Sequence, residues 1–330
     1  TLKVRDKEIL FTSGGTESNN MALIGTAMAN QRAGKHIIST RIEHASVYNP
    51  LAYLEQQGFE VTYLSVDSQG HISLEELEAA IRPDTILVSI MYVNNEVGAI
   101  EPVEQIASLI HGKNPAILFH VDAIQLTASL PYARRSREST CYLSVPIRFT
   151  GPKGVGFLYI DEKVKIRPLL YGGGQQKDMR SGTENVPGIA GMGRAAREIY
   201  TDHQQKGGGV YYRPERLHDR PHGIPAGRDR QQPQGNGERA PDCQRKLQGV
   251  RSEVLLHALE DKGIYVSSGS ACSSNHPAIS GTLKAIGVRQ ELLDSTLRFS
   301  FGVFNTKEEI DYCMEVLEEL LPVLRRYHRG

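Results

Sequence analysis

From Glu8 to Val121 the chain alternates between strand-like apolar runs and amphipathic helical patterns, and this alternation limits its possible folds more than any other feature. The apolar runs predict strands at Glu8–Thr12, His36–Ser39, Glu60–Leu64, Thr85–Met91 and Ile117–Val121. Apolar residues at helical spacing predict helices at Asn20–Ala29, Val47–Gln57, Leu74–Ile81 and Val103–His111. Such alternation is typical of α/β proteins with a largely parallel sheet, in which ligands bind at the carboxyl ends of strands.

The C-terminal part predicts a second, smaller α/β domain. Thr306 can cap a last helix, and Glu309 completes a capping box three residues later. Apolar residues follow at helical spacing: Ile310, Cys313, Leu317, Leu320, Leu321 and Leu324. Leu297–Ser300 predicts a strand, and Cys313 is interpreted as a packing residue. We therefore expect a large domain over residues 1–192 and a small domain over 193–330.

Composition excludes several classes of protein. The chain has 330 residues and zero formal net charge, whereas proteins that bind nucleic acid or membrane surfaces usually carry a basic excess. No apolar run approaches the roughly 18 residues of a membrane helix. The four cysteines have neither zinc-site nor redox-pair spacing, which favours a reducing cytoplasm and no metal. Because a strand follows almost directly on Thr1 without a signal peptide, we expect the true N-terminus to be missing.

Polar motifs follow the predicted strands. The sequence TSGGTESNN (Thr12–Asn20) precedes and begins a helix, and Gly15 and Thr16 could bind a phosphate at its N-terminus. The alternative is a tight turn that binds no ligand. Asp122 ends a strand and could hold a protonated pyridine nitrogen, with Gln125 in reach of the same ligand; a loop-capping aspartate is the alternative. His44 could stack on a ring and carry protons, or be structural.

Cys272 lies in the sequence SSGSACSS, among small and polar residues that cannot bury it. An exposed, mobile thiol suits a nucleophile that travels to its target. The alternative is a Ser/Gly loop that happens to contain a cysteine.

Together the motifs TSGGTESNN, EHAS, NNEVG, HVDAIQ, GPKG, RSGTEN and SSGSACSS, in this order, resemble the cysteine desulfurases of the nitrogen-fixation and iron–sulfur-cluster type. The resemblance covers about residues 7–127, 149–206 and 249–327. It implies a fold-type I pyridoxal-phosphate transferase fold, with a large domain of mostly parallel sheet and a smaller C-terminal α/β domain.

The resemblance also implies roles for individual residues. Those expected to contact the cofactor are Gly15 and Thr16 at the phosphate, His44 stacked on the ring, Asn95 and Gln125 at the ring hydroxyl, and Asp122 at the ring nitrogen. Thr183 is expected to reach the phosphate of the neighbouring subunit's cofactor, which implies a homodimer. Arg298 is expected to hold the carboxylate of L-cysteine. Cys272 is expected to take its sulfur as a persulfide for an iron–sulfur scaffold or a tRNA-thiolation protein, without direct contact with nucleic acid or membrane.

The chain departs from the family at the position of the lysine that forms the Schiff base with the cofactor. The family carries Ser-x-His-Lys three residues before the Gly-Pro-Lys-Gly turn, and here Ile147 and Arg148 stand in the last two places. Arginine stays protonated and is a very poor imine former. Lys153 already belongs to the turn, so the role is not transferred to it.

Two segments, 128–148 and 207–248, show no amphipathic period and are rich in arginine. A one-base shift converts codons for His-Lys into codons for Ile-Arg, which indicates out-of-frame segments from a sequencing error or a decaying gene; a flexible linker is the other interpretation of 207–248. The alternatives to a desulfurase are a selenocysteine lyase or another class V aminotransferase relative, and a non-catalytic, scaffold-binding or pseudogene-type chain.

Overall fold

The computed structural model describes residues 4–125, 151–198, 249–268, 280–300 and 305–326, and the backbone alone of two strands at 141–144 and 242–246. The described residues fall into two units. Unit 1 holds the described residues up to 198, except the loops Asp67–Gly70 and Asn95–Ala99. Unit 2 holds these two loops and the described residues from 242 onward.

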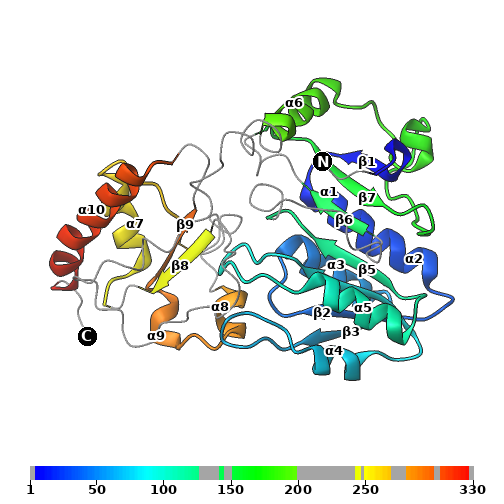
Figure 1. The fold of residues 1–330 in the computed structure, drawn as a ribbon, viewed down its shortest axis with the longest axis horizontal. Helices are drawn as coiled ribbons and strands as arrows, with labels where there is room; N and C mark the ends of the chain where they lie inside the picture. Colours follow the sequence, from blue (N-terminus) through cyan, green and yellow to red (C-terminus); the bar gives the residue numbers. More distant parts are fainter. Residues whose placement is uncertain are drawn as a thin grey trace. The chain divides into compact units, whose positions relative to one another are not determined.

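Unit 1 is built on a seven-stranded sheet with the order β1-β7-β6-β5-β4-β2-β3 (Figure 1). The strands are β1 (Ile9–Thr12), β2 (His36–Thr40), β3 (Glu60–Leu64), β4 (Thr85–Met91), β5 (Leu118–Asp122), β6 (Cys141–Ser144) and β7 (Gly156–Ile160). β7 pairs antiparallel with β1 and β6, and the other pairs in the sheet are parallel. The predicted α/β class with a largely parallel sheet is confirmed.

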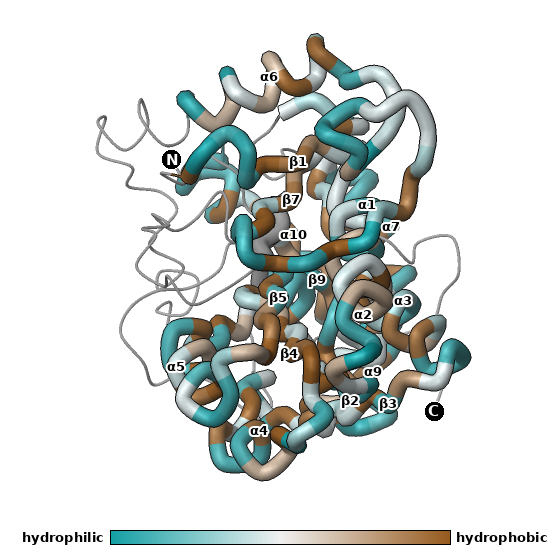
Figure 2. Tube along the Cα trace, turned by 90° about the vertical axis from the view of Figure 1, so that its right-hand side faces the viewer, coloured by the Kyte–Doolittle hydropathy of each residue, from teal (hydrophilic) through white to brown (hydrophobic). Residues whose placement is uncertain are grey.

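Helices cover both faces of this sheet. A helical stretch begins with α1 (Gly15–Asn20), continues through a π-helical turn (Met21–Gly25) and ends with α2 (Thr26–Asn30). The other helices of unit 1 are α3 (Ala45–Gln56), α4 (Leu74–Ala80), α5 (Val103–Lys113) and α6 (Val186–Arg197). Figure 2 shows α2 and α3 on one side of β4 and β5, and α4 and α5 on the other. Leu23, Ile37, Leu51 and Leu87 form the core between α2, α3 and the strands.

Unit 2 pairs β8 (Asp242–Lys246) with β9 (Thr296–Ser300) in an antiparallel ribbon. Its helices are α7 (Ser252–Glu260), α8 (Gly281–Ala285), α9 (Gln290–Leu293) and α10 (Lys307–Arg325). Leu255, Leu297 and Leu317 belong to its core, and Cys313 packs against them. None of the described helices combines the length and apolar character needed to cross a bilayer.

Most predicted elements are confirmed to within a residue or two at their ends, including the capping box of Thr306 and Glu309 on α10. The structure differs from the sequence prediction in the two anomalous segments. β6 lies inside 128–148 and β8 inside 207–248, and each pairs along its length with a neighbouring strand. The remainder of both segments lies outside the described residues. Pairing with a neighbour, rather than an internal apolar pattern, accounts for these two strands.

Candidate functional site

The first candidate element is the glycine turn between β1 and α1. Gly14 approaches the backbone of β7 so closely that a Cβ on Gly156 would lie 2.8 Å from the Gly14 Cα. Thr12 fixes the turn, since its hydroxyl contacts that of Ser18 at 2.6 Å. The turn leads into a helix start, where the N–H groups of the first residues have no intrahelical acceptor and the dipole favours an anion. Gly15 and the exposed Thr16 occupy this start.

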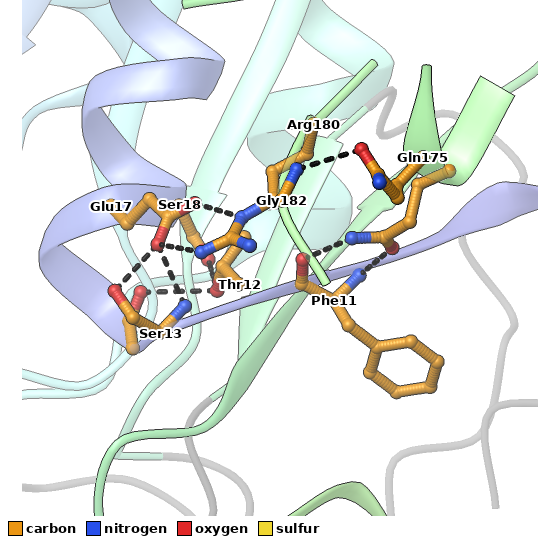
Figure 3. Close-up of polar contacts among 10 residues, drawn as sticks. Phe11, Thr12, Ser13, Glu17, Ser18, Gln175, Arg180 and Gly182 are labelled. Atoms are coloured by element: carbon orange, nitrogen blue, oxygen red, sulfur yellow. Dashed lines mark hydrogen bonds and ion pairs between the residues drawn. The ribbon is translucent and has the colours of Figure 1, made fainter. Parts of the chain in front are cut away.

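A partly buried ion pair joins this turn to the segment that carries Thr183. The Nε of Arg180 donates to Oε1 of Glu17 at 2.9 Å, and the Ser13 N–H donates to Oε2 at 2.8 Å (Figure 3). Burial of Glu17 opposes its ionisation, but the hydrogen bonds from Arg180 and Ser13 outweigh burial and lower its pKa. The pair therefore holds the 180–185 segment beside the glycine turn, and Thr183 in that segment is exposed.

Asp122 ends β5 and is 3% exposed. Its Oδ1 accepts the N–H of Ile124 at 3.1 Å, and its Oδ2 accepts the side-chain N–H of Asn19 at 3.0 Å. The bond to Ile124 is the local cap that the sequence left as an alternative, and the bond to Asn19 connects the carboxylate to α1. Gln125, three residues later, is also buried.

His44 caps the N-terminus of α3. Its Nδ1 accepts the N–H of Ser46 at 3.1 Å and lies 2.7 Å from the Ser46 hydroxyl. That hydroxyl also accepts the second side-chain N–H of Asn19 at 2.8 Å. Asn19 and Ser46 thus connect Asp122 to His44. Both lie inside motifs that the sequence singles out, but sequence reasoning assigned neither of them a role.

Two titratable groups lie beside this set, the half-buried Glu43 and the buried His120. Burial raises the pKa of Glu43 to about 8, although hydrogen bonds from Met91 and Thr40 favour the ionised form. The Oε2 of Glu43 is buried and has no hydrogen-bond partner among the described residues. Burial lowers the pKa of His120 to about 3, so this histidine is neutral, with Nδ1 2.8 Å from the Ser89 hydroxyl. Sequence reasoning predicted neither state, because both depend on tertiary burial.

Arg298 on β9 is 5% exposed, and its guanidinium donates to the backbone carbonyl of Asn95 at 3.0 Å. Its Nε is buried without a hydrogen-bond partner in the part of the chain that the structure describes. Unit 2 therefore brings together two of the predicted site residues and leaves a cationic donor unused.

Cys272, Ile147 and Arg148 lie outside the described residues. Two described residues near the ends of the segment with Cys272, Ser267 and Ser280, make hydrogen bonds within unit 2. Ser267 exchanges backbone hydrogen bonds with Arg298, at 3.1 and 2.8 Å, and the hydroxyl of Ser280 donates to the carboxylate of Glu96.

Known proteins match the chain along most of its length. The profile described as "Aminotransferase class-V" matches residues 1–313. "Cysteine desulfurase IscS" from Methanosarcina thermophila is 42% identical over 98% of this chain and 79% of that protein. "NifS/IcsS protein homolog" from Lactobacillus delbrueckii subsp. bulgaricus is 42% identical over 97% of this chain and 83% of that protein.

Solved structures agree with the sequence matches. A structure titled "NIFS-LIKE PROTEIN" has a TM-score of 0.86 and 37% identity, covering 98% of this chain and 85% of that one. The structure "SspA in complex with cysteine" has a TM-score of 0.75 and 29% identity, covering 93% of this chain and 84% of the other. By sequence and by fold, the chain belongs to the cysteine desulfurases of the class V aminotransferase family, whose cofactor is pyridoxal phosphate.

Proposed function

We propose that the chain carries the site of a cysteine desulfurase, which moves sulfur from L-cysteine to Cys272 and releases L-alanine, and that Arg148 deprives this site of its covalent bond to the cofactor. The observation that carries the proposal is the buried Asp122 at the end of β5, connected through Asn19 and Ser46 to His44. Relatives at 42% identity that are named cysteine desulfurases support the reaction.

The described residues fit pyridoxal phosphate. The helix start at Gly15 and Thr16 suits a phosphate, and Asp122, whose two oxygens each accept an N–H, suits a protonated ring nitrogen. We place His44 against the ring, with Asn95 and Gln125 toward its hydroxyl. When bound, the cofactor withdraws electrons from the α-carbon of the amino acid joined to it.

Arg298 is the proposed ligand of the substrate carboxylate. A buried guanidinium with an unused Nε offers a charge-assisted hydrogen bond, which is shorter and stronger than a neutral one. The bond to the Asn95 carbonyl restrains the guanidinium, so its remaining donors are held in one orientation. "SspA in complex with cysteine", a structure of the same fold, supports an amino-acid substrate of this size.

We propose that sulfur moves from the substrate to Cys272 in a single displacement. The Cys272 thiolate attacks the sulfur of the substrate cysteine, so an S–S bond forms and the carbon–sulfur bond breaks. The electron pair of the broken bond stays with the carbon fragment, which takes up a proton and leaves as alanine. His44 is proposed to carry protons in this sequence. The persulfide on Cys272 then passes to a sulfur acceptor, for which we propose an iron–sulfur scaffold or a tRNA-thiolation protein.

We further propose that the enzyme is a cytoplasmic homodimer in which Thr183 serves the cofactor phosphate of the partner subunit. Near the exposed Thr183, Val186 is 66% exposed and Tyr171 is 74% exposed. The Ser181 N–H donates to the Leu170 carbonyl at 3.2 Å, which ties the two stretches together. Exposed apolar side chains on both stretches support a subunit contact.

The experiment that tests the function restores the His-Lys pair that the family has at positions 147 and 148. An Ile147→His/Arg148→Lys variant, loaded with pyridoxal phosphate, should convert L-cysteine into equal amounts of alanine and, with a thiol reductant, sulfide. The unaltered chain should form neither. A folded, cofactor-loaded variant that forms no alanine would contradict the proposal. Turnover by the variant of selenocysteine but not cysteine would favour the lyase alternative.

A further inference from the structure

We propose that Asn19 is a positioning residue that fixes two groups of the site at once, the carboxylate of Asp122 and the protonation of the His44 ring. Asn19 lies in α1, is fully buried, and directs both of its side-chain N–H groups at neighbours from other elements. That these two groups serve a cofactor site rests on the proposed function. The hydrogen bonds of Asn19 themselves involve only residues of unit 1.

The contact with Asp122 determines which end of the Asn19 amide is the nitrogen and which is the oxygen. A carboxylate accepts hydrogen bonds and does not donate them, so the atom 3.0 Å from Oδ2 of Asp122 must be the amide nitrogen. The carboxylate then accepts one N–H on each oxygen, from Asn19 and from Ile124. Two such bonds hold the plane of the carboxylate and favour its ionised form, which is the form that can pair with a protonated ring nitrogen.

The contact with Ser46 determines the proton position on His44. The second N–H of Asn19 is donated to the Ser46 oxygen at 2.8 Å, so the Ser46 hydroxyl hydrogen is available for the His44 Nδ1 at 2.7 Å. Nδ1 also accepts the Ser46 N–H at 3.1 Å. Two donors on Nδ1 exclude a proton there, so the neutral ring carries its hydrogen on Nε2.

The burial of Asn19 supports a role beyond packing. Its Oδ1 is buried and has no hydrogen-bond partner among the described residues. An unsatisfied buried acceptor costs stability, and an alanine at this position would avoid that cost. The amide, unlike an alanine, donates hydrogen bonds to Ser46 and to Asp122.

The first test is a ¹⁵N NMR measurement of histidine tautomers in the chain without cofactor. With ¹⁵N-labelled histidine at about pH 8, where a histidine of ordinary pKa is neutral, the ring resonances of His44 are assigned by a His44→Gln variant. We expect an unprotonated Nδ1 in the unaltered chain. The Nδ1–H population should rise in Asn19→Ala, where the Ser46 hydroxyl is free to accept instead of donate, and in Ser46→Ala, where only the 3.1 Å bond from the Ser46 N–H is left on Nδ1. An Nδ1–H tautomer in the unaltered chain would overturn the proposal.

The second test is the equilibrium binding of pyridoxal phosphate, followed by its absorbance. We expect Asn19→Ala to bind about tenfold more weakly, as when one hydrogen bond to a charged group is lost. Asn30→Ala is the matched control: it lies in the same helical stretch, and its amide donates only to the carbonyls of Thr26 and Lys165. Equal affinity of the two variants would count against the proposal.

The two tests separate this proposal from the proposed function. If the unaltered chain binds no pyridoxal phosphate, the proposed site is contradicted, and the tautomer of His44 alone decides the role of Asn19. If Asn19→Ala does not fold, Ser46→Ala supplies the tautomer test, since it removes the hydroxyl while keeping the bond between Asn19 and Asp122.

Discussion

The guanidinium of Arg298 donates to the backbone carbonyl of Asn95 at 3.0 Å, while its buried Nε has no hydrogen-bond partner among the described residues. The loop Asn95–Ala99 thus restrains the charged group from one side and leaves a donor for a second acceptor. A carboxylate is the acceptor that best offsets the burial of a guanidinium.

Replacing this arginine should therefore impair substrate binding. In the Ile147→His/Arg148→Lys background, Arg298→Lys should raise the KM for L-cysteine roughly tenfold or more, because lysine cannot reproduce the planar fork of donors. The absorbance of bound pyridoxal phosphate should not change. Arg289→Lys, at an exposed position, is the matched control. An unchanged KM in Arg298→Lys would contradict the assignment.

The pair of Glu17 and Arg180 should make stability depend on acid pH. Because the folded state lowers the pKa of Glu17, the stabilisation is fully present above the unfolded value near 4.5 and is lost as the pH falls through the folded pKa. Glu17→Gln should cost about 1–2 kcal/mol at pH 7, the scale of a hydrogen bond to a charged group. Chemical denaturation should show this difference shrinking toward pH 3.

A matched variant is available for this test. Glu198 pairs with Arg194 at 2.7 Å on the exposed side of α6. Glu198→Gln should change stability by less than about 0.5 kcal/mol at any pH, because exposed pairs are screened by water. An equal effect of the two substitutions would contradict the special role of Glu17.

Glu43 should produce a pH dependence of the opposite sign. Its folded pKa of about 8 lies above the unfolded value of 4.5, so the folded state holds a proton that the unfolded chain releases. Stability is highest below the unfolded pKa and falls as the pH rises through about 8. Glu43→Gln, which resembles the protonated acid, should be neutral at pH 4 and stabilising at pH 9.

The expected gain at pH 9 is on the order of 2 kcal/mol or more, since each unit of pKa shift corresponds to about 1.4 kcal/mol. Thermal or urea unfolding from pH 4 to pH 9 provides the measurement. Glu60→Gln serves as a control, because Glu60 is exposed and its pKa is lowered by Arg82. Parallel pH profiles for the unaltered chain and Glu43→Gln would disprove a raised pKa of Glu43 in the folded state.

Cys272 should be indispensable for sulfur transfer but not for holding the cofactor. In the Ile147→His/Arg148→Lys background, Cys272→Ala should abolish sulfide release and leave the cofactor absorbance intact. Cys313→Ala, at the α10 residue that packs against the core of unit 2, should retain sulfide release. Conversion of cysteine to alanine by the Cys272→Ala form would rule out the thiol as sulfur carrier.

Local sequence patterns predicted most elements of the sheet and its helices, including the fully buried strands β2 and β4. The strands from β1 to β5 and the helices between them follow from such patterns, as does the capping box of α10. β7 was not predicted, although Gly156–Ile160 is an apolar run suited to a strand. Its antiparallel place between β1 and β6 depends on distant pairing, which a local pattern does not contain.

In the candidate site too, local patterns predicted individual residues but not the contacts between distant ones. Asp122 stood out because an acid at the carboxyl end of a buried strand has little structural reason to be there, and His44 because a histidine after a strand could stack on a ring and carry protons. The connection between them could not be predicted, because nothing in the sequence shows how the Asn19 amide is turned. Only the fold, which brings residues 19, 46 and 122 within hydrogen-bonding distance, reveals it.

The proposed pyridoxal-phosphate site lacks its covalent anchor, because Arg148 stands where the family has a lysine. Reduction with borohydride in the presence of the cofactor, followed by peptide mass spectrometry, tests this assignment most directly. The unaltered chain should carry no phosphopyridoxyl group at the site, because the guanidinium of Arg148 stays protonated below about pH 12. Arg148→Lys, with Ile147→His, should be labelled stoichiometrically at residue 148. Specific, stoichiometric labelling of the unaltered chain, for example on the exposed Lys153, would contradict the account.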